Sequence, residues 1–226
     1  MAKDSMYQQL TRPFLLTLSA LVACLGCASM SLPWKDQERT SIITPSMRIA
    51  AIQEIAARAK DADADERQKL TEQLATQIQT EPDPLVRQAI QAAMAEMSTD
   101  LARDVLIAGL QDDDLDVRLT CCEGLGREAD PSVISALRVA LETDEELDVQ
   151  LAAIDALGQI RSPQSVAALA TAVNDRDPAL QYAGVQALKA VSGKDLGNDV
   201  TAWRQYAASE QPEISLAERP QGWSPF

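Results

Sequence analysis

Histidine is absent from this chain of 226 residues, and aromatic residues make up only 4% of it. Because histidine is the commonest metal ligand and a frequent general base, its absence excludes metal centres built on paired histidines and catalysis by a histidine base. The sequence also shows no nucleophile motif around Ser, Lys or Tyr and no glycine loop of the kind that holds phosphate. We therefore predict no catalytic residue, no cofactor and no metal site.

Cysteine is scarce as well, with four residues in the whole chain. Cys24 and Cys27 lie near the N-terminus, whereas Cys121 and Cys122 are neighbours in the middle of the sequence. Adjacent cysteines on one helix are badly placed to bond each other. We interpret Cys121 and Cys122 as small buried hydrophobes, with a redox or metal-binding role as the alternative.

Positive charge is in short supply. Lys and Arg number 20 against 34 Asp and Glu, which gives a formal net charge of −14 at pH 7. So acidic a chain disfavours nucleic acid and anionic lipid headgroups as partners. The acids gather at residues 112–114 and 144–146 and at Asp175 and Asp177. They form either a ridge for a cationic protein or a divalent metal, or loop residues and helix caps. Without a calcium-loop pattern, we favour the second interpretation.

What the chain does contain is an internal repeat. Val86, Val117, Val149 and Leu180 are equivalent anchors at spacings of 31, 32 and 31 residues. A small residue follows each anchor after seven positions and a large apolar residue after eight, which predicts a closely packed helix A. The small residues are Ala93, Gly124, Ala156 and Ala187, and the large ones are Met94, Leu125, Leu157 and Leu188. Near the end of one helix A, the segment Gly124-Leu125-Gly126 predicts close packing together with helix termination.

A second apolar stripe predicts a helix B in each repeat. Twenty residues after the anchors come Leu106, Leu137, Leu169 and Val200, and twenty-four after them come Leu110, Leu141 and Val173, with Arg204 breaking the pattern. Helix starts are indicated by a capping residue before proline. These pairs are Asp83-Pro84, Asp130-Pro131, Ser162-Pro163 and Asp177-Pro178.

An earlier repeat begins at Met47, whose spacing to Val86 is 39 residues. We assign the excess to the polar run 58–66 between the two helices. The sequence thus predicts an all-α fold, an α-solenoid of about five antiparallel helix pairs over residues 45–207, with atypical first and last units that act as caps.

This pattern resembles the short HEAT-like repeats found in phycobilisome lyase-related proteins. The segments that carry the resemblance are Asp116-Val117-Arg118 followed by Gly124-Leu125-Gly126, Asp148-Val149-Gln150 followed by Ala156-Leu157-Gly158-Gln159-Ile160, and Pro178 followed by Ala187-Leu188. The resemblance implies a superhelix of the HEAT and armadillo type. HEAT-like relatives with metal-dependent hydroxylase activity use paired His-Glu motifs, which a chain without histidine lacks. Residues 192–199 with Trp203 look like a closing unit in which the tryptophan seals the array.

The N-terminal segment predicts export. Lys3 and Arg12 precede an apolar run at 14–23, which is too short for a membrane span. The sequence Leu21-Val22-Ala23-Cys24 resembles a bacterial lipobox, so we predict a lipoprotein signal peptide at 1–23 and an acylated Cys24, with Cys27 as the alternative acylation site. An ordinary cleaved signal or an anchor helix remains open. Residues 24–44 would form a flexible linker.

Helical arrays of this kind recognise other proteins through the surface of their B helices. We expect the candidate partner surface to comprise Asp104, Ile107, Gln111, Arg138, Glu142 and Asn174, with Ala170 beside them. The proline-rich tail, residues 208–226, ends with Trp223 and Phe226, which either dock onto another protein, fold back over the last repeat or stay disordered.

These observations together predict a non-catalytic protein-binding or scaffold module of the bacterial cell envelope. Its repeat domain would lie in the periplasm or outside the cell, held to a membrane by the N-terminal lipid. The alternative is an auxiliary subunit, similar to a chromophore lyase, that holds the substrate of an enzyme without supplying catalytic groups.

Overall fold

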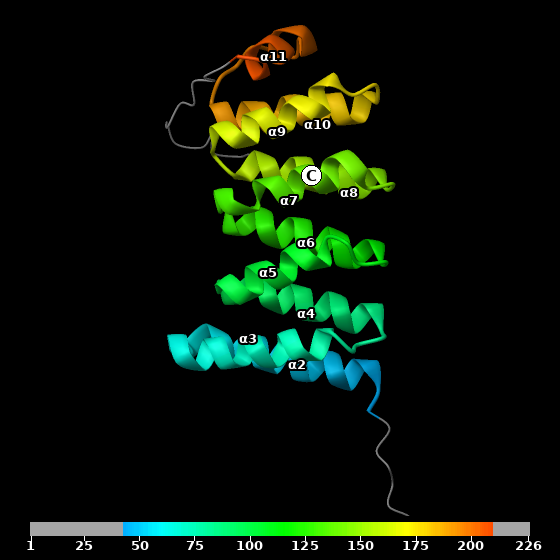
Figure 1. Ribbon diagram of the computed structural model, residues 1–226, viewed down its shortest axis with the longest axis vertical. Coiled ribbons are helices and arrows are strands. Elements are labelled where there is room, and N and C mark those ends of the chain that lie inside the picture. Colours follow the sequence, from blue (N-terminus) through cyan, green and yellow to red (C-terminus); the bar gives the residue numbers. More distant parts are fainter. Residues whose placement is uncertain (1–42, 210–226) are drawn as a thin grey trace, which may run out of the picture. The chain divides into compact units, whose positions relative to one another are not determined.

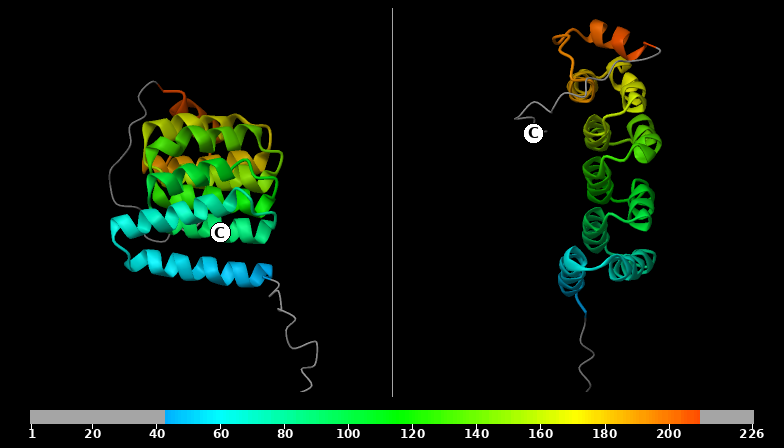
Figure 2. Two further views of the ribbon diagram at one scale, coloured as in Figure 1. Left: turned by 60° about the horizontal axis from the view of Figure 1, so that its bottom comes forward. Right: turned by 90° about the vertical axis from the view of Figure 1, so that its left-hand side faces the viewer.

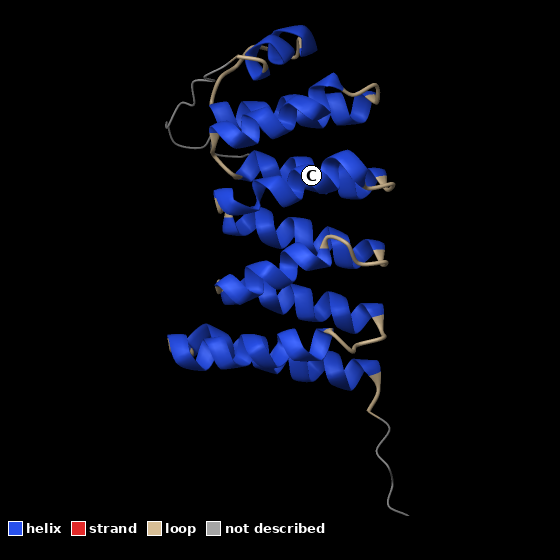
Figure 3. Cartoon of the chain, in the orientation of Figure 1, coloured by secondary structure: helices blue, strands red, loops and turns tan. Residues whose placement is uncertain are grey.

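The computed structural model of the chain describes residues 43–209. The predicted signal peptide, Cys24, Cys27 and nearly all of the linker lie outside these residues, as do the predicted docking residues Trp223 and Phe226. Within 43–209 the fold contains helices and loops only (Figure 3). None of the helices in this part of the chain is both long and apolar enough to cross a bilayer.

The helices form five consecutive pairs, as the repeat predicts (Figure 1). The A helices are α2 (Pro45–Asp61), α4 (Pro84–Met97), α6 (Leu115–Glu128), α8 (Leu147–Gln159) and α10 (Pro178–Ser192). The B helices are α3 (Ala64–Ile78), α5 (Asp100–Gly109), α7 (Ile134–Thr143), α9 (Pro163–Asn174) and α11 (Val200–Ala207). The predicted all-α solenoid is confirmed.

The pairs stack into two layers. Each A helix packs on the next A helix along the chain, from α2 through to α10. The B helices form a second layer, which the right-hand view of Figure 2 shows as a separate column. Between the layers lies one continuous apolar core. The four anchors belong to it, since Val86, Val117 and Val149 are fully buried and Leu180 is 4% exposed.

Capping side chains start the helices where the sequence indicates. Asp83, Ser162 and Asp177 accept hydrogen bonds from the backbone N–H groups two residues ahead, which satisfies donors that a helix start leaves without partners. Asp130 also accepts such a bond, from Ser132, but it begins a 3₁₀ turn, η1 (Pro131–Val133), ahead of α7.

Small residues set the distance between consecutive A helices. A Cβ atom on Gly126 would lie 2.8 Å from Ala156 Cα of the next A helix, and one on Gly158 would lie 3.0 Å from Ala187 Cβ. The predicted close packing is therefore present. The predicted termination is not, because α6 continues past Gly126 and ends when Ala129 adopts a left-handed conformation with φ 55°.

The extra residues of the first repeat lengthen its helices and do not form a polar loop between them. Helices α2 and α3 contain 17 and 15 residues, whereas α4 and α5 contain 14 and 10. Only Ala62 and Asp63 separate α2 from α3. Much of the run 58–66 is helical because Asp63 caps α3 through the Glu66 N–H and Arg58 pairs with Glu66 across the turn.

The last pair is built differently from the others. Arg204, which interrupts the helix B pattern, donates from Nε to the carbonyl of Val173 at 2.7 Å and so caps the end of α9. Trp203 is fully buried, and its indole N–H donates to the Gly197 carbonyl at 2.9 Å. The buried tryptophan extends the shared apolar core to α11, the last helix of the described residues.

We predict that Gly126→Val lowers the free energy of unfolding by about 1–3 kcal/mol, because the new side chain would overpack the contact with the Ala156 backbone. Urea denaturation followed by circular dichroism measures this. Ala92→Val, at an exposed position of α4, is the matched control and should change stability by only about 0.5 kcal/mol. Equal losses in the two variants would show that α6 and α8 do not meet this closely.

Candidate protein-binding surface

The B layer exposes most of the side chains predicted to contact a partner. Asp104, Gln111, Arg138, Glu142 and Asn174 are all exposed. Two of the predicted residues do not face solvent as expected. Ile107 and Ala170 are half-buried and pack against the core, because each lies next to a buried leucine on a helix whose apolar stripe is wider than a single row.

The structure does not bring these residues together into one site. Arg138 and Glu142 lie on α7, where Arg138 Nε is 3.9 Å from Glu142 Oε1. The same carboxylate accepts a hydrogen bond of 3.2 Å from Thr171 on α9. Asn174 instead donates to the carbonyl of Ala170 on its own helix. The polar side chains of α7 and α9 are thus engaged with one another.

Asp104 lies at a groove between the first two B helices. The groove has a volume of about 350 Å³, with walls from α3 and α5 and a floor from α4. Apolar walls come from Ile78, Leu101 and Val105. Among the described residues, the Asp104 carboxylate forms neither a hydrogen bond nor an ion pair. Of the predicted partner residues, Asp104 lines this groove, and Gln111 lines a second, polar hollow near the loops that follow α5 and α7.

The floor of the groove contains a buried polar group that lacks a full set of partners. Gln91 is 2% exposed, and its Nε2 donates to the Val105 carbonyl at 3.3 Å. Its Oε1 atom is buried and has no hydrogen-bond partner among the described residues. Gly109 makes room for the amide, because a Cβ atom there would lie 2.4 Å from Gln91 Nε2. A buried acceptor without a donor is unfavourable and calls for an explanation.

The edge of the array formed by the loops before each A helix holds a ladder of hydrogen bonds that sequence reasoning missed. The residues directly after the anchors are Arg48, Arg87, Arg118, Gln150 and Gln181. Four of them donate to the carbonyl six residues earlier, with distances of 2.8 Å for Arg118 and Gln150 and 2.7 Å for Gln181. The sequence feature that could have predicted this ladder is a long polar residue, Arg or Gln, directly after each anchor.

The arginines of this ladder also link consecutive repeats. Arg87 makes two hydrogen bonds to Asp112, at 2.8 and 2.7 Å, and Arg118 makes two to Asp144, at 2.8 and 3.1 Å. Such bidentate pairs are stronger than hydrogen bonds between neutral groups. The hydrogen bonds that Arg87 and Arg118 donate to these carboxylates raise the pKa of both arginines above the usual arginine value.

The acid clusters therefore serve mainly the loops and helix starts. Asp112, Asp144 and Asp175 each accept the N–H group two residues ahead, and Asp114 caps α6. A polar hollow of about 380 Å³ lies between the loops near Asp113 and Glu145. Within residues 43–209 no cluster of three or more acids or cysteines is arranged to hold a metal ion.

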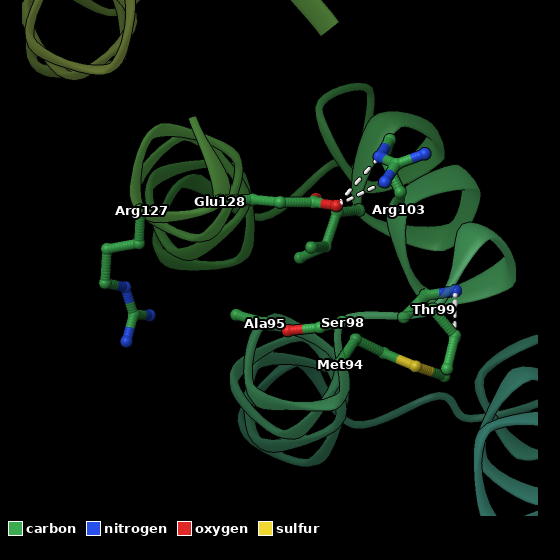
Figure 4. Close-up of a pocket in the computed structure, with 9 residues that line it drawn as sticks. Met94, Ala95, Ser98, Thr99, Arg103, Arg127 and Glu128 are labelled. Carbon is green, nitrogen blue, oxygen red and sulfur yellow. Dashed lines mark hydrogen bonds and ion pairs between the residues drawn. The ribbon is translucent and has the colours of Figure 1, made fainter. Parts of the chain in front are cut away.

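A smaller cavity of about 90 Å³ lies among α4, α5 and α6 (Figure 4). Arg103 and Glu128 point toward each other across one side of it, with Arg103 Nε 2.9 Å from Glu128 Oε1. Arg127 points away from this pair. Arg103 also bonds Asp100 and contacts Asp130, so its charge is balanced by acids of its own chain. The ion pairs of Arg103 beside this cavity therefore join α5 to α6.

Cys121 and Cys122 are free thiols buried in α6. Burial raises the pKa of Cys122 to about 12 and the pKa of Cys121 well above the usual thiol value. The thiolate is the nucleophile and the metal ligand, and burial disfavours this form of both side chains. Their location fits the interpretation that they pack as hydrophobes.

Two layers of paired helices, a shared core and a repeat of 31 or 32 residues define an α-solenoid. A family model of HEAT repeats matches residues 71–154, 104–189 and 135–203, which together span more than half of the chain. The chain therefore belongs to the HEAT-repeat family, whose members are generally non-catalytic and commonly mediate interactions between proteins. No curated protein matches the chain.

We predict that the ladder makes stability depend on pH. Burial by itself raises the pKa of Asp112, but the hydrogen bonds from Arg87 and from the Asp114 N–H outweigh it and hold this pKa below its usual value. The lowered pKa stabilises the fold fully above the unfolded-state pKa of about 3.9, and this contribution is lost as pH falls further. Asp112→Asn should cost about 1 kcal/mol at neutral pH and flatten the acid limb of the curve. Urea denaturation from neutral pH to acid measures both.

Asp148→Asn removes an exposed acid from the same edge and is the control for the change in net charge. It should leave the acid limb as steep as that of the unchanged chain. If Asp112→Asn and Asp148→Asn gave identical curves, the pairing of Asp112 with Arg87 would not contribute to stability.

Proposed function

We propose that this chain is a non-catalytic protein-binding scaffold that recognises its partner through the B layer. The observation that carries the proposal is the groove between α3 and α5, which lies on the layer that faces away from the stacked A helices. It combines apolar walls with the carboxylate of Asp104, which has no partner within residues 43–209. Membership of the HEAT-repeat family supports a role in protein interaction. Arg87 pairs with Asp112 and Arg118 pairs with Asp144, so these ionic groups are engaged in holding loops together.

We further propose that the scaffold works in a bacterial cell envelope, tethered by a lipid on Cys24. This part rests on the lipobox-like sequence Leu21-Val22-Ala23-Cys24 after a basic and then apolar segment. A single acyl chain binds membranes only weakly, at about 0.8 kcal/mol per buried methylene, and stable anchoring takes more than one chain. The tether would hold the repeats near the membrane while leaving the B layer available to a partner.

The alternative is an auxiliary subunit, similar to a chromophore lyase, that holds a substrate protein. It rests on the resemblance of residues 116–126 and 148–160 to phycobilisome lyase-related repeats. Crosslinking in living cells followed by mass spectrometry separates the two functions. Recovery of envelope proteins favours the scaffold, whereas recovery of one pigment-binding protein favours the auxiliary subunit. Failure to recover any protein above a mock sample would count against both.

We predict that Cys24→Ala abolishes incorporation of a clickable palmitate analogue into the chain and moves it from the membrane fraction to the soluble fraction. The thiol of Cys24 is the expected site of acylation, so its removal leaves no attachment point. Cys27→Ala is the matched control and should retain the label. Loss of label only in Cys27→Ala would assign the lipid to Cys27, and undiminished label in both variants would show that the tether does not depend on either cysteine.

A further inference from the structure

We propose that the groove between α3 and α5 binds a protein segment in which an aliphatic side chain lies next to a lysine or arginine. The inference deepens the proposed scaffold function, and rests on it, by assigning one site and the chemistry of its partner. At this groove the second repeat differs from the other repeats of the array.

The departure is the pair Gln91 and Gly109. Positions equivalent to Gln91 hold Ile52, Cys122, Ile154 and Val185, all of them buried apolar residues. Positions equivalent to Gly109 hold Ala140, Ala172 and Trp203. The second repeat alone therefore places an amide in this row and removes the side chain that would collide with it. A local break of a packing rule is the expected signature of a functional site.

The break lies directly under the groove. Gln91 lines the groove floor and is 98% buried, and its Oε1 atom is left without a donor. An isoleucine, as at position 154, would fill the same row without an unsatisfied acceptor. The amide becomes favourable when the side chain turns its buried Oε1 atom toward the groove and accepts an N–H group from a bound segment. Buried polar groups of this kind give a binding site its selectivity.

The walls and the mouth define the rest of the partner. Ile78, Leu101 and Val105 offer apolar contact to one aliphatic side chain. At the mouth, Arg87 is neutralised by its two bonds to Asp112. The Asp104 carboxylate stays unpaired among the described residues and can accept a cation. An acidic chain with a net charge of −14 adds long-range attraction for a basic segment.

The test uses the full chain and random dodecapeptides displayed on phage, selected in about 0.3 M NaCl so that unspecific attraction by the acidic surface is screened. We expect enrichment of an aliphatic residue adjacent to Lys or Arg. The enriched peptide is labelled with fluorescein, and its affinity is measured by polarisation. Replacing its aliphatic residue with Ser or its basic residue with Glu should each weaken binding by about tenfold.

Three variants then locate the site. Asp104→Lys and Ala108→Trp, which blocks the groove from an exposed position of α5, should each weaken peptide binding by about tenfold or more. Gln91→Ile should weaken it by about fivefold while the thermal midpoint is kept or raised, because an unsatisfied acceptor is removed. Glu123→Lys makes the same charge change as Asp104→Lys at an exposed position of α6, outside the B layer, and should alter affinity by less than about twofold.

The outcomes separate the groove from the wider function. Peptides that bind Asp104→Lys and Ala108→Trp as tightly as the unchanged chain would overturn the groove and leave protein binding intact, at another surface. No enriched peptide, together with no partner recovered by crosslinking in cells, would remove the proposed function as well. The C-terminal segment of the chain contains a basic residue of its own, Arg219, and would compete with the peptide if it occupied the groove. If Arg219→Glu raised peptide affinity by about tenfold, this segment would be the occupant, and the proposal of an external partner would be wrong.

Discussion

The contact between small residues on consecutive A helices is the constraint on which the array depends. At Gly126 and Gly158 the neighbouring helix comes so close that even a methyl group would need the partner to move. This close approach fixes the spacing of the A layer, and it lets the buried anchors of all repeats join one core. The B helices then pack over that core at the same interval. Large side chains at the glycine positions would change the spacing and with it every surface that the B layer offers.

The ion pairs of the arginine ladder stabilise the loops between repeats. Arg87 and Arg118 link each loop to the next one, and the carboxylates that they bind also accept backbone N–H groups. Paired in this way, the acids stabilise turns that would otherwise leave polar backbone groups without partners. The surface left for a partner is consequently smaller than the formal charge suggests. Exposed charged residues outside this network, Asp104 among them, and the Gln91 amide remain for a partner.

In a repeat array, equivalent positions of successive units can be compared with one another. A residue type shared by most units shows what packing needs at that position, and a unit that differs there is a candidate for a further role. The buried row of Ile52, Cys122, Ile154 and Val185 demonstrates that an apolar residue suffices there. Gln91 is therefore best understood by what it does beyond packing, namely to present an acceptor at the floor of a groove. Gly109, Arg204 and Trp203 are similar departures, and the last two close the array.

The sequence by itself determined the repeat, its register and its helix starts. Periodicity and capping are local properties. The sequence alone therefore identifies Val86 as a buried anchor and Asp83 and Asp177 as helix caps. Only the tertiary structure decided which polar residues are free. Arg87 and Asp112 lie 25 residues apart, and Asp104 meets Ile78 and Gln91 only after three helices have packed together. Ile107 is half-buried and not fully exposed as expected, because the burial of a helix face depends on its neighbours as well as on its own sequence; its place in the partner surface stays a prediction.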